Sequence, residues 1–162
     1  MPKTVERAVP PDLADFQSKL KRGRHHRYVY VTLLGLKTDD PIEINQRILD
    51  GLSYRALERF QRNVDLPMTT LATLIHIPPR TLSRRKEEGR LQPDESDRLV
   101  RISRIVGKSV ELFEGDFAAA RKWLSAPLRS LRGKAPLELA ATEVGAQEVE
   151  ALIGRLEHGI IS

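Results

Sequence analysis

The sequence contains no cysteine among its 162 residues. Disulfide bonds, cysteine nucleophiles and thiolate-bound zinc are therefore excluded, and stability must come from packing. The four histidines offer no replacement zinc site, because none are spaced at i, i+3 or i, i+4, the spacing that directs two imidazole rings at one ion. The sequence therefore predicts a protein without a bound metal.

Long hydrophobic runs are also missing. The longest apolar segment, residues 28–36, is far shorter than the roughly 20 residues of a membrane-spanning helix, and no signal-peptide pattern is present. We therefore expect a cytoplasmic protein with no membrane association. The sequence also lacks a G-x-x-x-x-G-K-[ST] phosphate loop, a G-x-S-x-G nucleophile motif and a paired-carboxylate motif. These absences predict a protein that is not an enzyme and needs no cofactor.

The chain does have an excess of basic residues, concentrated in its middle. The formal net charge is +5, and residues 66–108 hold 9 Lys and Arg against 5 Asp and Glu. Residues 109–162 hold 6 against 8 and are mildly acidic. A cationic segment before an acidic one suggests two functions, the first with a polyanion such as nucleic acid. The alternative is an ordinary scatter of charge.

Residues 1–40 contain three early prolines, a basic cluster and few large apolar residues. This composition predicts an N-terminal arm of uncertain structure, mobile or partly helical. Within it, residues 28–36 are rich in β-branched and aromatic side chains. At this length periodicity leaves two alternatives open, a short strand or the start of a buried helix.

Residues 41–108 have helical apolar spacing, with a tight turn between two short helices. His76 lies at the turn and tolerates the positive φ that a turn requires. Ile77 is expected to fill the core below it. Pro79 suits the first position of the next helix, since a proline there leaves no N–H unpaired. Two short helices joined in this way predict a helix-turn-helix domain.

The helix after the turn, RTLSRRKEEGRL at residues 80–91, carries the candidate DNA contacts. With Leu82 directed at the core, Arg80 and Arg84 project to the opposite side, where a recognition helix faces bases and phosphates. Arg85 and Lys86 are expected at the domain edge, against phosphate or a neighbouring acid. The predicted DNA-binding residues are Arg80, Thr81, Ser83, Arg84, Arg85 and Lys86. The alternative is a solvated surface helix with an Arg84–Glu88 ion pair.

Residues 109–162 are predicted to form a second, smaller helical domain. A long helix is expected from the acidic turn at residues 94–97 to Phe113, because apolar residues recur in it at helical spacing. This helix would connect the two domains. The predicted fold class is therefore all-α, with an N-terminal helix-turn-helix bundle joined by a long helix to a small helical domain.

Two segments of the sequence carry a family resemblance. The segments PPRTLSRRKEEGRLQPDESDRLVRI and FEGDFAAARKWLSAPLRSLRGKAPLELAATEVGAQEVEALIGRLEHGI resemble an Xre-type antitoxin of the Xre/MbcA/ParS class, over roughly residues 42–162. The resemblance implies an antitoxin of a type II toxin–antitoxin system. It implies that residues 109–162 bind a RES-domain toxin, which degrades NAD⁺, and cover its active site. It also implies that the protein binds operator DNA and represses its own operon.

The resemblance also assigns residues in the C-terminal domain. Its W-L, L-x-G-x-x-P-L and L-x-x-G signatures fall on Trp123, Leu124, Leu131, Gly133, Pro136, Leu137, Leu156 and Gly159. Most of these are expected to be fold residues, and Trp123 is expected in the core because it shares a helix face with Phe117. The expected toxin contacts are the terminal residues Glu157, His158, Gly159, Ile160, Ile161 and Ser162. The two isoleucines either pack on their own core or insert into the partner.

The sequence departs from a generic helix-turn-helix at the turn itself. His76 takes the place of the common glycine, and Pro78 and Pro79 replace the usual Ser or Thr cap. A weakly capped recognition helix predicts weak DNA binding by a monomer, so we expect a homodimer that presents two half-sites. The competing hypothesis is a free-standing repressor whose C-terminal domain dimerises or senses a ligand. An enzyme acting on a small anion is supported only by the basic charge.

Overall fold

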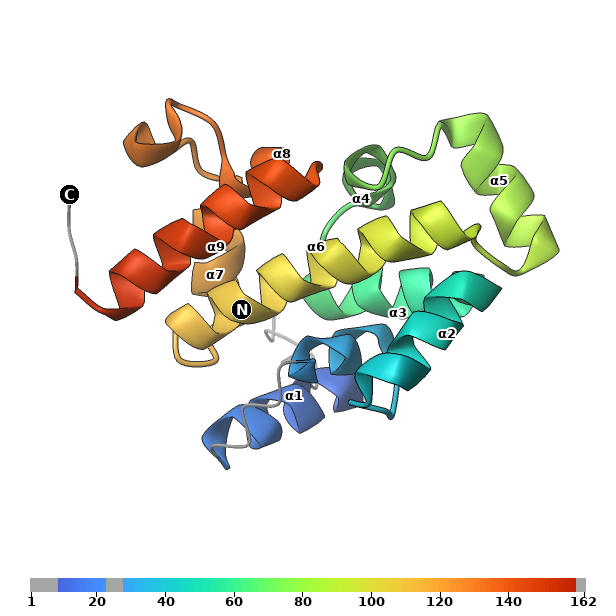
Figure 1. Cartoon of the computed structure of the whole chain (residues 1–162), viewed down its shortest axis with the longest axis horizontal. Coiled ribbons are helices and arrows are strands. Elements are labelled where there is room, and N and C mark those ends of the chain that lie inside the picture. Colours follow the sequence, from blue (N-terminus) through green and yellow to red (C-terminus); the bar gives the residue numbers. More distant parts are fainter. Residues whose placement is uncertain (1–8, 23–27, 160–162) are drawn as a thin grey trace, which may run out of the picture.

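The computed structural model describes residues 9–22 and 28–159, and every regular element within these ranges is helical (Figure 1). The all-α prediction is confirmed. The elements in chain order are α1 Pro11–Lys21, η1 Val29–Leu34, α2 Pro41–Asp50, α3 Tyr54–Val64, α4 Met68–Leu74, α5 Pro79–Glu88, α6 Pro93–Leu112, α7 Phe117–Ser125, η2 Arg129–Leu131, α8 Pro136–Leu139 and α9 Glu143–Glu157, where η marks a 3-10 helix.

The helices begin where the sequence supplies caps or prolines. The side chains of Asp40, Ser53, Asp116 and Thr142 accept hydrogen bonds from backbone N–H groups in the first turns of α2, α3, α7 and α9. Such caps satisfy N–H groups that have no partner within the helix. The other α-helices, apart from α4, begin on a proline, and so does α2. Proline is tolerated there because the first N–H of a helix has no partner within the helix.

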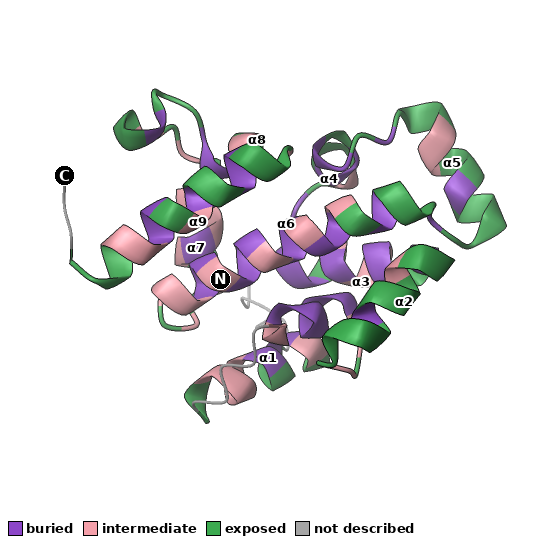
Figure 2. Ribbon diagram, viewed as in Figure 1, coloured by how far each residue is buried: buried purple, intermediate pink, exposed green. Residues whose placement is uncertain are grey.

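Helix α6 is the element around which the others pack. Its 20 residues run through the centre of the molecule, and η1, α2, α3, α7 and α9 all contact it (Figure 1). The expected long helix is confirmed. The expected domain boundary at residue 108 falls inside α6, and one continuous hydrophobic core extends from Leu13 to Ile153. The helix-turn-helix segment and the C-terminal segment therefore share both a helix and a core (Figure 2).

The described N-terminal region is helical over Pro11–Lys21, in line with one of the two alternatives for the expected arm, and it packs on the rest of the protein. Phe16 of α1 and Leu33 of η1 are fully buried, and the Phe16 ring contacts Phe117 edge to face at 6.1 Å. The described parts of residues 1–40 therefore belong to the core. Residues 29–34 form a buried 3-10 helix, which rules out the strand and is closer to the alternative of a buried helix. Composition does not predict this packing, because only a few apolar residues on one face of α1, such as Leu13 and Phe16, hold the helix on the core.

Candidate DNA-binding and partner-binding sites

The turn between α4 and α5 has the geometry that the sequence predicts. His76 has a φ of 58°, and Ile77 is only 3% exposed. The Ile77 N–H donates to the carbonyl of Ala72 at 2.9 Å, which closes the turn. Pro79 is the first residue of α5, and no side chain caps that helix. The predicted helix-turn-helix arrangement is therefore present, with α5 in the position of a recognition helix.

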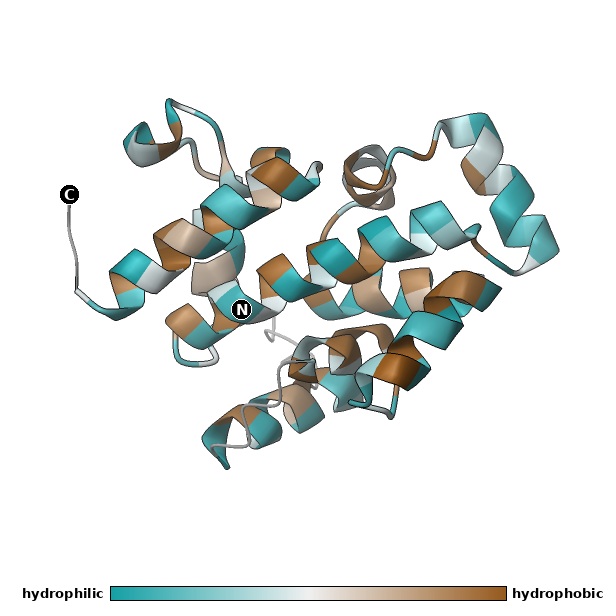
Figure 3. Ribbon diagram, in the orientation of Figure 1, coloured by the Kyte–Doolittle hydropathy of each residue, from teal (hydrophilic) through white to brown (hydrophobic). Residues whose placement is uncertain are grey.

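Helix α5 presents a polar, exposed face at one end of the molecule (Figures 1 and 3). Four of the predicted DNA contacts are exposed on it, namely Arg80, Ser83, Arg84 and Lys86. Thr81 is half-buried. Arg84 Nε lies 3.8 Å from Glu88 Oε1, with side chains 60% and 45% exposed. A long, solvated pair of this kind contributes well under about 1 kcal/mol, so it leaves the Arg84 guanidinium available to DNA.

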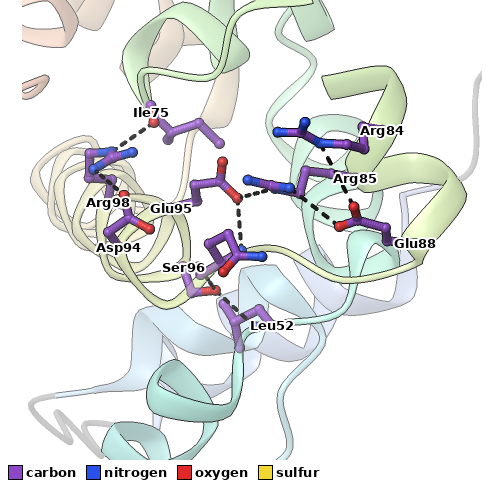
Figure 4. A network of polar contacts seen from close by, with 10 residues as sticks. Leu52, Ile75, Arg84, Arg85, Glu88, Asp94, Glu95, Ser96 and Arg98 are labelled. Carbon is purple, nitrogen blue, oxygen red and sulfur yellow. Dashed lines mark hydrogen bonds and ion pairs between the residues drawn. The ribbon is translucent and has the colours of Figure 1, made fainter. Parts of the chain in front are cut away.

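Arg85 is placed differently from the other predicted contacts. Its side chain is 11% exposed and its Nε donates to Glu95 Oε1 at 2.7 Å (Figure 4). The hydrogen bond that Arg85 donates to the Glu95 carboxylate also raises the pKa of Arg85 above its ordinary value. Of the two partners expected for Arg85, phosphate or a neighbouring acid, the structure shows the acid, Glu95, in a buried ion pair. The inward direction of α5 lies between Leu82, which is half-buried, and Arg85, which is buried, and not at Leu82 itself.

Four of the eight C-terminal residues assigned by resemblance are buried, as expected of fold residues. Leu124, Leu131, Pro136 and Leu137 lie in the core.

The other assigned residues described in this domain are less buried. Trp123 is half-buried, and its ring lies 6.1 Å from that of Phe113. Gly133 has a φ of 81°, which its turn requires and which a larger residue would strain. Leu156 is the exception, because it is 39% exposed near the end of α9 and does not act as a core residue.

The expected toxin contacts lie at and beyond the end of α9. Glu157, His158 and Gly159 are exposed, and Gly159 has a φ of 67° just past the helix. The His158 ring nitrogen Nδ1 lies 2.7 Å from the carbonyl oxygen of Gly154, which ties the imidazole to the last turn. Ile160, Ile161 and Ser162 fall outside the described residues.

A row of basic residues on α6 joins the two segments, and sequence reasoning missed it. Arg98 Nε donates to the carbonyl of Ile75 at 2.7 Å, beside the helix-turn-helix turn. Arg101 Nη2 donates to the carbonyl of Ala141 at 3.0 Å. The His76 ring nitrogen Nε2 lies 2.9 Å from the same oxygen. The turn and the C-terminal segment therefore meet at one carbonyl group.

The same row continues with ion pairs to α9. Arg104 Nε lies 2.8 Å from Glu150 Oε1, and Lys108 Nζ lies 2.5 Å from Glu150 Oε2. Burial disfavours the charged form of Arg104, but the carboxylates of Glu150 and Glu143 outweigh it and raise the pKa of Arg104. The signal in the sequence is the helical spacing of the four basic residues, Arg98, Arg101, Arg104 and Lys108, which places them on one face.

Within residues 9–22 and 28–159, no three histidine or acidic side chains are grouped so as to hold a metal ion. None of the helices in these ranges is long and apolar enough to cross a membrane.

Comparison with known proteins matches both segments. Residues 43–104 match the antitoxin Xre-like helix-turn-helix domain, and residues 109–159 match the antitoxin Xre/MbcA/ParS C-terminal toxin-binding domain. The chain is 36% identical to "Antitoxin Xre" of Yersinia enterocolitica over 130 residues, which cover 80% of this chain and 88% of the relative. It is 34% identical to "Antitoxin Xre" of Pseudomonas putida over 119 residues, which cover 72% of each chain. The chain therefore belongs to the Xre antitoxin family.

Proposed function

We propose that this protein is the antitoxin of a type II toxin–antitoxin system. In this proposal it binds a cognate RES-domain toxin, blocks the toxin's NAD-degrading active site, and binds operator DNA to regulate its own operon. The proposal rests on one observation: the same chain matches both a helix-turn-helix domain and a toxin-binding domain of antitoxins, and each carries an exposed candidate surface. The protein acts as a non-enzymatic regulator in the cytoplasm.

The DNA-binding half of the proposal rests on the exposed face of α5. Arg80 and Arg84 extend from this face, and an arginine can donate two hydrogen bonds to the O6 and N7 atoms of guanine or contact phosphate. Ser83 is exposed beside them, and its hydroxyl can donate to a base or to a phosphate. We propose that these three side chains, with Thr81 and Lys86 at the margin, contact the operator. A homodimer would present two such helices to a two-fold operator.

The toxin-binding half rests on the match of residues 109–159 to a toxin-binding domain. We propose that the end of α9 and the residues after it, Glu157 to Ser162, form the contact that covers the toxin's active site. Glu157 and His158 are exposed there. The buried face of α9, with Val149, Leu152 and Ile153, holds this segment on the rest of the protein.

Co-expression tests the proposal directly. The neighbouring reading frame of the same operon is expressed alone and together with this chain, and growth and cellular NAD⁺ are followed. We expect growth arrest and NAD⁺ loss with the neighbour alone, and recovery with both. A harmless neighbour, or toxicity that persists beside this chain, contradicts the proposal.

The competing function is a free-standing repressor whose C-terminal domain only dimerises or senses a ligand. It predicts full operator binding and no stable complex with the neighbouring gene product. Affinity purification of this chain from cells expressing both genes separates the two functions. We expect the neighbour to co-purify in a fixed ratio.

A further inference from the structure

The recognition helix is attached to the rest of the protein in an unusual way. Of the ten residues of α5, Arg85 is the only one that is buried. Leu82 and Thr81 are half-buried, and the rest of the helix is exposed (Figure 2). No side chain caps its first turn. The main anchor of α5 is therefore a charged side chain rather than an apolar one.

Glu95 accepts the hydrogen bond from Arg85 and also takes part in the capping box of α6. Arg85 Nε donates to Glu95 Oε1 at 2.7 Å, and the backbone N–H of Gln92 donates to the same oxygen at 2.7 Å (Figure 4). The Glu95 side chain is only 6% exposed. Arg85 Nη1 also reaches Glu88 Oε2 at 3.3 Å, within α5. One carboxylate oxygen therefore links the middle of α5 to the first turn of α6.

The hydrogen bond between Arg85 and Glu95 is directional, and this property sets the orientation of α5. Apolar contacts hold surfaces together without fixing an angle, whereas a hydrogen bond between charged groups is short and directional. The Arg85–Glu95 hydrogen bond therefore fixes the rotation of α5 about its own axis. Arg84 is the next residue along the chain, so its direction changes with any rotation of Arg85. A rotation of one helix by a few tens of degrees would move a guanidinium several ångströms away from a base edge.

We infer that Arg85 and Glu95 are positioning residues for operator recognition, which they serve by holding α5 at the angle that presents Arg80 and Arg84 to DNA. Neither side chain touches DNA in this role. The inference rests on the proposed DNA-binding function and adds to it the residues that set its specificity.

The inference is tested by the direction in which operator affinity changes when Glu95 loses its negative charge. Glu95→Gln removes a negative charge from a protein that binds a polyanion, so electrostatics alone would leave operator affinity unchanged or raise it. Positioning predicts the opposite. We expect operator affinity to fall roughly 10- to 100-fold, the loss that corresponds to a hydrogen bond to a charged partner. Affinity for DNA of random sequence should change little.

Asp97→Asn is the matched control. Asp97 lies near the start of the same helix and is exposed, and within the described residues it has no ion-pair partner. Its substitution makes the same charge change without touching the link. We expect operator affinity equal to or slightly above that of the wild-type chain. The assay is fluorescence anisotropy with a promoter duplex and a scrambled duplex, at a temperature where circular dichroism shows both variants folded.

A second substitution guards against a general loss of structure. Arg85→Lys keeps the charge but loses the planar donor geometry. If the two residues act as one unit, the double variant Arg85→Lys with Glu95→Gln binds the operator no more weakly than whichever single variant binds it less tightly. Additive losses contradict the inference. So does equal weakening on promoter and scrambled DNA.

The outcomes also separate the inference from the function beneath it. If the wild-type chain, alone and with its toxin, binds no promoter duplex, the proposed DNA-binding function fails and the inference fails with it. If the wild-type chain binds and Glu95→Gln behaves like Asp97→Asn, the inference alone is overturned.

Discussion

Asp12 shows how one side chain holds the N-terminal helix on the core. Its carboxylate accepts hydrogen bonds from Arg59 Nη2 at 2.7 Å and from Asn63 Nδ2 at 2.9 Å. Burial acts to raise the pKa of Asp12, but these hydrogen bonds outweigh it and lower the pKa below its usual value. The ionised form is therefore favoured in the folded state. Its contribution to stability is present at neutral pH and is lost as the pH falls through the lowered pKa.

Replacing Asp12 with Asn is expected to lower the free energy of unfolding at pH 7 by about 1–2 kcal/mol, because the pair with Arg59 is partly solvated. The difference from the wild-type chain should shrink at pH 3, where the wild-type carboxyl begins to protonate. Urea denaturation at both pH values measures this difference in the free energy of unfolding. Asp15→Asn is the control, because Asp15 is 57% exposed and forms only a surface pair with Lys19. Equal effects of the two substitutions would contradict the role of Asp12.

Two glycines inside helices are expected to respond to alanine with opposite signs. At Gly107 of α6, an added Cβ would lie 2.6 Å from the Cβ of Tyr30, so η1 packs there only because the side chain is absent. At Gly154 of α9, an added Cβ meets no atom within 4 Å. Gly107→Ala should destabilise by about 1–3 kcal/mol through overpacking. Gly154→Ala should stabilise by up to about 1 kcal/mol through helix propensity. Thermal unfolding of both variants tests the pair, and a stabilised Gly107→Ala would refute the close approach of η1.

At the scale of elements, local signals decided which parts of the fold could be predicted. The turn at His76 and the start of α5 at Pro79 depend on φ and on a missing N–H, which are properties of those residues themselves. The N-terminal segment and the burial of Arg85 depend on partners far away, such as Phe117 for Phe16 and Glu95 for Arg85. A helical wheel gives the periodicity of a face but not which partner lies opposite it. The same reasoning located the exposed Arg80 and Arg84 and missed the basic row on α6.

Helix α9 depends on its first turn. Thr142 Oγ1 accepts a hydrogen bond from the Gly145 N–H at 3.1 Å. Thr142→Ala removes this cap and should cost about 1 kcal/mol. The midpoint of thermal unfolding should then fall by roughly 2–4 °C for a chain of this size. Thr73→Ala serves as the control, because the Thr73 hydroxyl donates within α4 and caps no helix. An unchanged midpoint for Thr142→Ala would show that α9 is held by packing alone.

At the scale of the whole molecule, the two matched domains are not independent. Helix α6 passes from one to the other, and its basic face contacts the backbone of the helix-turn-helix turn, the end of α8 and the acids of α9. Apolar packing between the segments is continuous as well. A chain built in this way should unfold in one cooperative transition. The proposed DNA-binding surface and the proposed toxin-binding surface then belong to one cooperative unit.

Arg101 gives the sharpest test of that unity. Its side chain is 11% exposed, and it donates to the carbonyls of Ala140 and Ala141 at 3.3 and 3.0 Å. Arg101→Met keeps most of the apolar stem but removes these donors. The free energy of unfolding should fall by about 1–3 kcal/mol. The Ala140 carbonyl loses this donor, and the Ala141 carbonyl, which also contacts His76, loses one of its two side-chain partners. Arg129→Met, at an exposed arginine of η2, should change it by less than about 0.5 kcal/mol.

The shape of the urea unfolding curve for Arg101→Met carries further information. Tryptophan fluorescence follows the C-terminal segment, since the only tryptophan is Trp123, while far-ultraviolet circular dichroism follows all helices. If the α6 contacts unite the two segments, these probes coincide in the wild-type chain and separate in Arg101→Met, with the fluorescence change at lower urea. Separate transitions in the wild-type chain would mean that the two domains fold independently, and that the shared helix transmits no stability from one to the other.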